Sequence, residues 1–175
     1  VSLQDDRTGQ YYRAAQAGID ERWEEVRNVR LPPDHFERNF APEFLISRSY
    51  FINHRYYEST RSEFDIVTMG NRAHKEGDWH PLDMLLIPLT TRDDKLIGVI
   101  SVDEPEDGKV PTLEGIQAIE VFANQAVTAI ENAKSYQRVR ELSIQDGLTG
   151  VFNHRHFQQM LLKEVQRARR SSGRR

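Results

Sequence analysis

Two apolar runs decide the fold of this chain: Met84-Leu85-Leu86-Ile87-Pro88-Leu89 and Leu96-Ile97-Gly98-Val99-Ile100-Ser101-Val102. Both runs have the length of strands, and their near-continuous apolar character is typical of strands buried on both faces. The polar link of residues 91–95 is short enough to join them as an antiparallel hairpin. The sequence therefore predicts an antiparallel sheet that contains this hairpin.

The residues before this hairpin predict further, shorter elements. Residues 1–15 fit a hairpin in which Gly9 takes a turn position with positive φ, and residues 49–53 are rich in strand-forming side chains. A short helix is expected over about residues 32–44, because its two leading prolines are tolerated in a first helical turn. Residues 21–31 are ambiguous between helix and strand.

A long helix is predicted after the hairpin. Thr112 is a candidate N-cap, Glu114 is favourable in the first turn, and no proline interrupts the chain to about Gln145. The apolar residues recur in steps of three and four as far as Ala133, and in steps of three beyond it. These residues are Ile116, Ile119, Ala123, Ala126, Ile130 and Ala133, followed by Tyr136, Val139 and Leu142.

This spacing has two interpretations. In one, a single amphipathic helix lies on the sheet, and for its first half we expect this, with Val121, Phe122 and Val127 widening the apolar face. In the other, residues 134–145 form a parallel dimeric coiled coil, which the change of step after Ala133 overwinds locally. We expect the coiled coil for this second half.

Composition excludes several classes of protein. The chain is 38% hydrophobic and 29% charged, which fits a soluble globular protein with exposed helices. No apolar run is long enough to span a membrane and no signal peptide is recognisable, so we expect a cytoplasmic protein. The absence of cysteine removes disulfides, thiolate metal sites and cysteine nucleophiles. Residues 163–175 are basic but carry no aromatic side chains to stack on bases, so no nucleic-acid partner is expected.

Two segments resemble the GAF family of sensory domains. The first runs from Trp79 to Asp103 and resembles the central strands of that family. The second is Phe122-Ala123-Asn124-Gln125-Ala126-Val127-Thr128-Ala129-Ile130-Glu131-Asn132-Ala133, similar to the terminal helix F-A-x-Q-A-x-x-A-I-E-N-A. The resemblance implies an α/β (α+β) fold with a central antiparallel sheet flanked by helices. It also implies helices on one face of this sheet, a ligand pocket or its vestige on the other face, and a long C-terminal signalling helix. It also implies a helix before the first strand, which is missing here.

A third segment resembles the start of the GGDEF domain of bacterial diguanylate cyclases. It reads Asp146-Gly147-Leu148-Thr149-Gly150-Val151-Phe152-Asn153-His154-Arg155, against D-x-L-T-G-x-x-N-x-R in the family, and the match continues through Phe157, Leu161 and Glu164. The resemblance implies structural roles, in the turn and at the start of the next helix, for Asp146, Leu148, Thr149, Asn153 and Arg155. Where a second arginine is often found, this chain has His154.

The two resemblances imply a domain organisation. Residues 1–133 form the GAF domain, residues 134–145 a linker helix, and residues 146–175 the truncated start of the GGDEF domain. The GG[D/E]EF loop, its metal-binding carboxylate and its guanine-reading residues would fall beyond Arg175. We therefore expect no catalytic residues, no metal and no cofactor in this chain, although a parent cyclase would use Mg²⁺ and GTP to make cyclic di-GMP.

The GAF resemblance also points to a small-molecule pocket formed by strands and loops. Its candidate residues are Tyr50, Phe51, Trp79, His80 and Asp103, which combine aromatic and polar groups as ligand sites do. The alternative is that Trp79 and Phe51 belong to the core and that His80 lies on a solvated loop.

The sequence shows no residue pattern typical of a metal site or a catalytic site. The candidate haem or metal ligands are His35, His54, His74 and His80, and none forms a compact ligand pattern with another histidine or a carboxylate. Ser101 and Asp103 share a strand face, but no base is evidently paired with them. We therefore expect a sensor that biases the packing of a homodimeric C-terminal helix in response to a small-molecule effector. The alternative is a ligand-free dimerisation or protein-interaction module.

Overall fold

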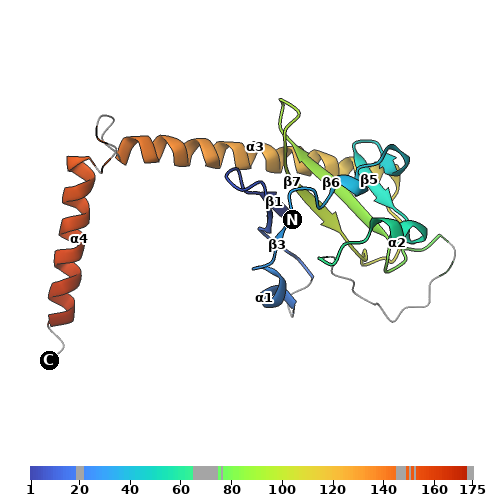
Figure 1. Ribbon diagram of the computed structural model, residues 1–175, viewed down its shortest axis with the longest axis horizontal. Coiled ribbons are helices and arrows are strands. Elements are labelled where there is room, and N and C mark those ends of the chain that lie inside the picture. Colours follow the sequence, from blue (N-terminus) through green and yellow to red (C-terminus); the bar gives the residue numbers. More distant parts are fainter. Residues whose placement is uncertain are drawn as a thin grey trace. The chain divides into compact units, whose positions relative to one another are not determined.

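The computed structural model describes residues 1–18, 22–64, 75, 77–144, 149, 151 and 153–172. The chain divides into two compact units, Val1–Thr128 and Ala129–Arg175. The first unit contains the sheet and the beginning of the long helix (Figure 1). No helix in the described part of the chain is long and apolar enough to cross a membrane.

The sheet has seven strands in the order β3-β2-β1-β7-β6-β5-β4, and every pair of neighbours is antiparallel. The strands are β1 (Ser2–Gln4), β2 (Tyr11–Arg13), β3 (Arg30–Leu31), β4 (Leu45–Ile46), β5 (Ser49–Ile52), β6 (Met84–Thr90) and β7 (Leu96–Val102). The predicted hairpin of the two apolar runs is thus confirmed as β6–β7, at the centre of the sheet. Leu85, Leu86 and Ile87 are successive and all fully buried, so β6 is covered on both faces.

The first hairpin is also confirmed. Gly9 has φ of 74° in the turn between β1 and β2, and its N–H donates to the carbonyl of Asp5 at 2.8 Å. The Asp5 carboxylate accepts hydrogen bonds from the backbone N–H groups of Arg7 and Thr8, which closes the turn. β1 then pairs with β7 beside Gly98, where an added Cβ would lie 2.5 Å from the carbonyl oxygen of Ser2. Only glycine allows the two strands to approach this closely.

The helices are α1 (Trp23–Val26), α2 (Tyr57–Thr60), α3 (Leu113–Ile144) and α4 (His154–Ser172), with 3-10 turns η2 (Glu37–Asn39), η3 (Pro42–Phe44) and η4 (His54–Tyr56). The prediction of one helix over residues 32–44 is wrong, because two separate 3-10 turns occupy this segment. Pro42 disfavours the helical conformation in the residue before it, and Ala41 is extended at φ −80° and ψ 145°.

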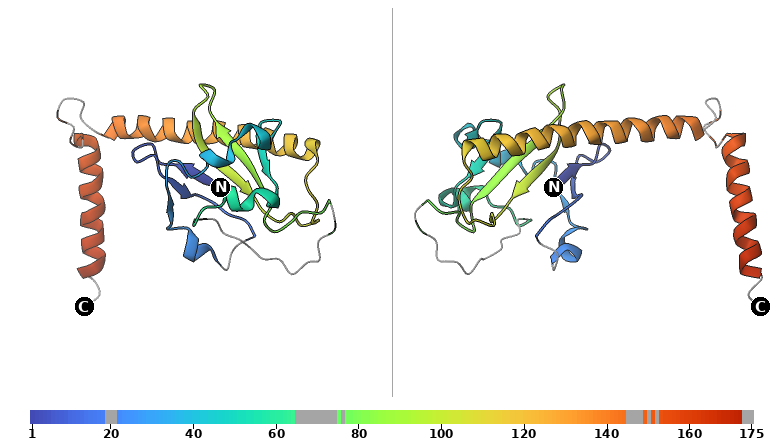
Figure 2. Two further views of the ribbon diagram at one scale, coloured as in Figure 1. Left: turned by 45° about the vertical axis from the view of Figure 1, so that its right-hand side comes forward. Right: turned by 180° about the vertical axis from the view of Figure 1, so that it is seen from behind.

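The first half of α3 lies on one face of the sheet. It passes behind the sheet in Figure 1 and in front of it in the right-hand view of Figure 2. Thr112 caps the helix as predicted, with its Oγ1 accepting from the N–H of Gly115 at 3.2 Å. Ile116, Ala123 and Val127 are buried, which confirms the amphipathic interpretation for this half.

Two residues expected on the apolar face of α3 lie elsewhere. Val121 is 54% exposed and Phe122 is 68% exposed, so the prediction that they widen the sheet-packed face is wrong. At 100° per residue, both positions fall on the side of the helix away from Ile116. The position that does join the buried face is Glu120, which is only 4% exposed.

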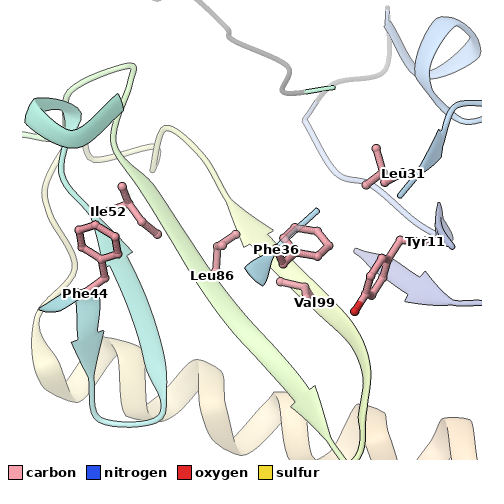
Figure 3. Packing of buried hydrophobic residues seen from close by; sticks show 7 residues of the cluster. All are labelled: Tyr11, Leu31, Phe36, Phe44, Ile52, Leu86 and Val99. Atoms are coloured by element: carbon pink, nitrogen blue, oxygen red, sulfur yellow. The ribbon is translucent and has the colours of Figure 1, made fainter. Parts of the chain in front are cut away.

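The opposite face of the sheet carries a mixed aromatic and aliphatic core. Its buried members are Tyr11, Leu31, Phe36, Phe44, Ile52, Leu86 and Val99 (Figure 3). Tyr11 and Phe36 meet edge to face with ring centroids 5.0 Å apart, a geometry that aromatic pairs prefer. The segment between β3 and β4 therefore covers this face in place of a regular helix.

The second unit contains the end of α3 and α4. Tyr136 and Val139 are 73% and 64% exposed, and the described side chains between residues 131 and 140 are all exposed. The coiled coil expected over residues 134–145 stays a prediction, and helical spacing gives a second description of the change of step after Ala133. The sheet-packed stripe ends near Ile130, and Tyr136 and Val139 continue a second stripe on the exposed side of the helix. By helical spacing this stripe comprises Ala118, Phe122, Gln125, Ala129, Asn132, Tyr136 and Val139.

Candidate functional site

A cavity of about 310 Å³ opens on the face of the sheet that carries the aromatic core. Its wall is formed by the ends of β2 and β7, by α1 and by the segment that follows β3. The lining residues with polar or aromatic groups include Arg13, Trp23, His35, Phe64, Ser101 and Asp103. A cavity of this size fits a small molecule.

Arg13 organises the rim of this cavity. Its Nη1 donates to the carbonyl of Val26 at 3.3 Å, and its Nη2 donates to the carbonyl of Phe64 at 3.0 Å. One guanidinium thereby ties the end of α1 to the segment after α2, which are distant in sequence. Because arginine stays protonated, this side chain also keeps a positive charge at the rim.

The residues that β7 and the segment after β3 contribute to the cavity have different chemistry. Ser101 lies on β7 opposite Leu86 of β6, which places it on the core face, and Asp103 follows two residues later. His35 is 7% exposed, and its ring makes T-shaped contacts with those of Phe36 and Phe64 at centroid distances of 4.6 Å and 6.0 Å. The cavity thus combines an aromatic wall with a hydroxyl, a carboxylate and a guanidinium, which suits a small molecule with polar groups on a flat apolar body.

The structure distributes the predicted pocket residues over separate places. Asp103 lines the cavity, whereas Tyr50 packs on Phe40 with ring centroids 4.8 Å apart on the same face. Phe51 points to the helix side of the sheet, where it meets Trp79 at 5.7 Å in a T-shaped contact. Trp79 is 2% exposed and belongs to the core, whereas Phe51 is partly buried.

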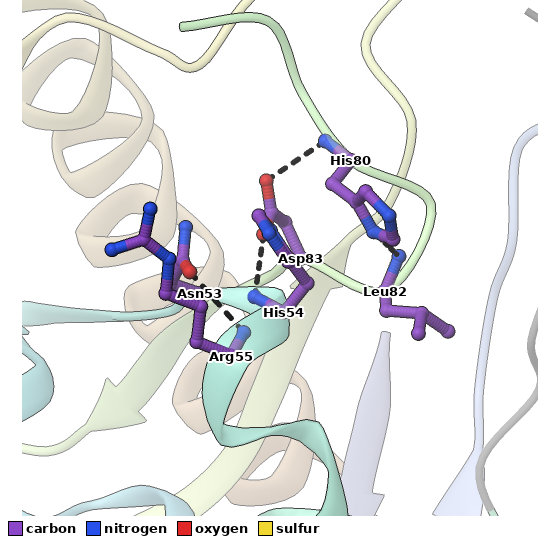
Figure 4. A network of polar contacts seen from close by, with 6 residues as sticks. All are labelled: Asn53, His54, Arg55, His80, Leu82 and Asp83. Carbon is purple, nitrogen blue, oxygen red and sulfur yellow. Dashed lines mark hydrogen bonds and ion pairs between the residues drawn. The ribbon is translucent and has the colours of Figure 1, made fainter. Parts of the chain in front are cut away.

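His80 belongs to a polar cluster around Asp83 (Figure 4). The buried Asp83 carboxylate accepts from the backbone N–H of His54 at 2.7 Å and from that of His80 at 2.8 Å. The Nδ1 atom of His54 lies 2.9 Å from the same carboxylate, and the two imidazoles stack with centroids 4.1 Å apart. The N–H of Leu82 donates to Nδ1 of His80 at 3.1 Å, so that nitrogen is an acceptor. The cluster joins the two ends of the segment between β5 and β6.

These contacts give the cluster a structural role. Within the ranges that the structure describes, no group of three or more His, Asp or Glu side chains is arranged to hold a metal ion. His74, another candidate ligand in the sequence, lies outside the described residues.

A second polar centre, which was not predicted from the sequence, lies between α3 and the sheet. The carboxylate of Glu120 accepts hydrogen bonds from Ser49 Oγ at 2.7 Å, from the N–H of Arg48 at 2.8 Å and from Ser47 Oγ at 2.9 Å. Arg48 Nε lies 3.6 Å from the same carboxylate. Burial acts to raise the pKa of Glu120, but these hydrogen bonds outweigh it and hold the pKa below its ordinary value. The available signal was a carboxylate inside an apolar stripe, between Ile116 and Ala123.

The residues assigned to the start of the GGDEF domain are only partly described. Asp146 and Leu148 lie outside the described residues, and Thr149 lies in a turn. Asn153 directly precedes α4, and its carbonyl accepts from the N–H of Phe157 at 3.0 Å. Arg155 falls in the first turn of α4.

Comparison with known proteins adds no relative. No family model matches this chain, and neither the curated proteins nor the solved structures contain a significant match.

Proposed function

We propose that the first unit is a GAF-like sensory domain that controls a diguanylate cyclase domain through α3. The sequence motifs quoted above motivate this proposal. The antiparallel sheet, with the start of α3 on one face and a cavity on the other, supports it. In this proposal α4 is the first helix of the cyclase domain, and Mg²⁺, GTP and the catalytic residues belong to the rest of that domain.

The cavity is the observation that carries the sensory part of the proposal. It opens on the face of the sheet opposite α3, where the GAF resemblance leads us to expect a pocket, and it presents polar groups from several elements. Native mass spectrometry of the purified chain tests this part. A mass above a multiple of 20.4 kDa that is lost on denaturation would support a bound ligand. Clean multiples of the chain mass from cells of several growth conditions would count against it.

The second candidate function is a dimerisation module without a ligand, and the exposed stripe of α3 favours it. Phe122, Tyr136 and Val139 are large, solvent-exposed and spaced in steps of three and four with Gln125, Ala129 and Asn132 between them. Such spacing is typical of a coiled-coil seam. A homodimer through this stripe is compatible with both functions, because a sensor can act by changing how two helices pack.

A further inference from the structure

Glu120 connects α3 to one particular part of the sheet, the hairpin of β4 and β5. All three of its hydrogen-bond donors lie on Ser47, Arg48 and Ser49, at the turn of this hairpin and the start of β5. Glu120 is 4% exposed and Ser49 is fully buried, so water competes little for these bonds. Charge-assisted hydrogen bonds in such surroundings are among the stronger polar contacts in proteins.

The turn between β4 and β5 binds this carboxylate through two of its groups. Ser47 has φ of 60°, a backbone conformation that residues other than glycine adopt at a cost in energy. In two-residue hairpin turns the position with positive φ is commonly glycine. Here the hydroxyl of Ser47 and the N–H of Arg48 both bind Glu120, which stabilises the strained turn from the helix side.

The other face of β5 contacts a row of aromatic rings that ends at the cavity. Tyr50 follows Ser49 and packs on Phe40 at 4.8 Å, and Phe40 stacks on Phe36 at 6.2 Å. Phe36 meets His35 at 4.6 Å, and both of these line the cavity. β5 therefore contacts the aromatic row on one face and the Glu120 carboxylate on the other.

We propose that Glu120 is a positioning residue that couples the aromatic row beside the cavity to α3 through the β4–β5 hairpin. A change in the packing of Phe36, Phe40 and Tyr50 moves β5, and β5 moves Glu120 and with it α3. The coupling deepens the proposed function, because it supplies the route from cavity to helix. Its test needs neither a ligand nor cyclase activity, so it can fail while the sensory proposal stands.

The test is a double-mutant cycle read by hydrogen–deuterium exchange on the whole chain. Phe40→Leu perturbs the aromatic row, Glu120→Gln removes the charge of the anchor, and Glu131→Gln is the matched control at an exposed acid of α3. We expect Glu120→Gln to raise exchange of the α3 amides over residues 116–127 by about tenfold. Phe40→Leu should raise exchange in β4–β5 and in these α3 amides together.

The cycle distinguishes coupling from simple destabilisation. In the Glu120→Gln background, Phe40→Leu should still loosen β4–β5 but should change α3 exchange less than twofold further. Equal increments at α3 in both backgrounds would overturn the proposal, because independent effects add. If Glu120→Gln does not fold, Ser49→Ala replaces it and removes only one of the three hydrogen bonds. A smaller effect of Phe40→Leu on α3 exchange in that background would again support the coupling, and an equal effect would overturn it.

Discussion

The carboxylate of Asp83 accepts a hydrogen bond from the backbone N–H of His54 at 2.7 Å, although 29 positions separate the two residues. The same carboxylate accepts from the N–H of His80, so one buried side chain holds both ends of the segment between β5 and β6. Asp83→Ala should lower the free energy of unfolding by about 2–4 kcal/mol, since it leaves two backbone donors without their acceptor. Urea unfolding measures this, with the exposed Asp93→Ala as control. A loss no larger than that of the control would contradict the structural role.

Replacing Gly98 or Gly115 by alanine should change the free energy of unfolding in opposite directions. Gly98→Ala would place a Cβ 2.5 Å from the Ser2 carbonyl oxygen and 2.7 Å from Leu3, so β1 must move from β7. We expect a loss of about 1–3 kcal/mol in the free energy of unfolding. Gly115→Ala in α3, where an added Cβ would lie 3.5 Å from Thr112 Oγ1, should instead be neutral or stabilising by up to about 1 kcal/mol. Thermal unfolding of both variants checks this. Equal changes in their stability would argue against the close approach of β1 and β7 at Gly98.

Glu120 makes stability depend on pH. Its folded pKa lies below the ordinary value of 4.5, so the unfolded chain binds the proton more readily. The stabilisation is fully present above about pH 4.5 and is lost as the pH falls through the folded pKa. The difference in unfolding free energy between the wild type and Glu120→Gln should therefore shrink on acidification below that pH. Denaturant titrations from pH 6 downwards measure it, and a difference that does not change with pH would contradict the account.

The exposed stripe of α3 predicts a homodimer. Tyr136→Glu places a charge in the middle of the stripe and should convert a dimer to a monomer. Arg138→Glu is the control, because it is exposed and lies on the other side of the helix by its spacing. Sedimentation equilibrium gives the mass of each. Dimers that survive Tyr136→Glu but not Arg138→Glu would show that another face of α3 makes the contact.

Much of the sheet could be predicted from the sequence, because its signals are local. Residues 84–89 and 96–102 are long apolar runs with a short link, and Gly9 marks a turn that its own neighbours close. The segment between β3 and β4 could not be predicted as well. Pro33 fits a helix start, but Pro42 forces Ala41 out of the helical region and divides the segment.

The candidate site was less predictable, because its contacts join residues that are distant in sequence. Arg13, His35 and Ser101 meet at one cavity only once β2, β7 and the segment after β3 are assembled. Glu120 had a local signal, a carboxylate in an apolar stripe, but its partners lie more than 70 positions away at the β4–β5 turn. Periodicity placed Ile116 and Ala123 correctly, yet it could not assign Phe122 to the exposed side until the sheet defined the buried face.

The central claim is that this chain senses a signal and controls a cyclase. In the most direct test, residues 1–175 are fused in frame to the remainder of an active GGDEF domain. Cyclic di-GMP formed from GTP in the presence of Mg²⁺ is then measured for the wild-type fusion, for Ser101→Phe, which adds a ring to the lining of the cavity, and for Ser59→Phe, an exposed control outside it. The account predicts an active fusion whose output changes at least about twofold with Ser101→Phe and not with Ser59→Phe, because a ligand-sized change biases the two-state helix packing. An active fusion with the same output in all three proteins would contradict it.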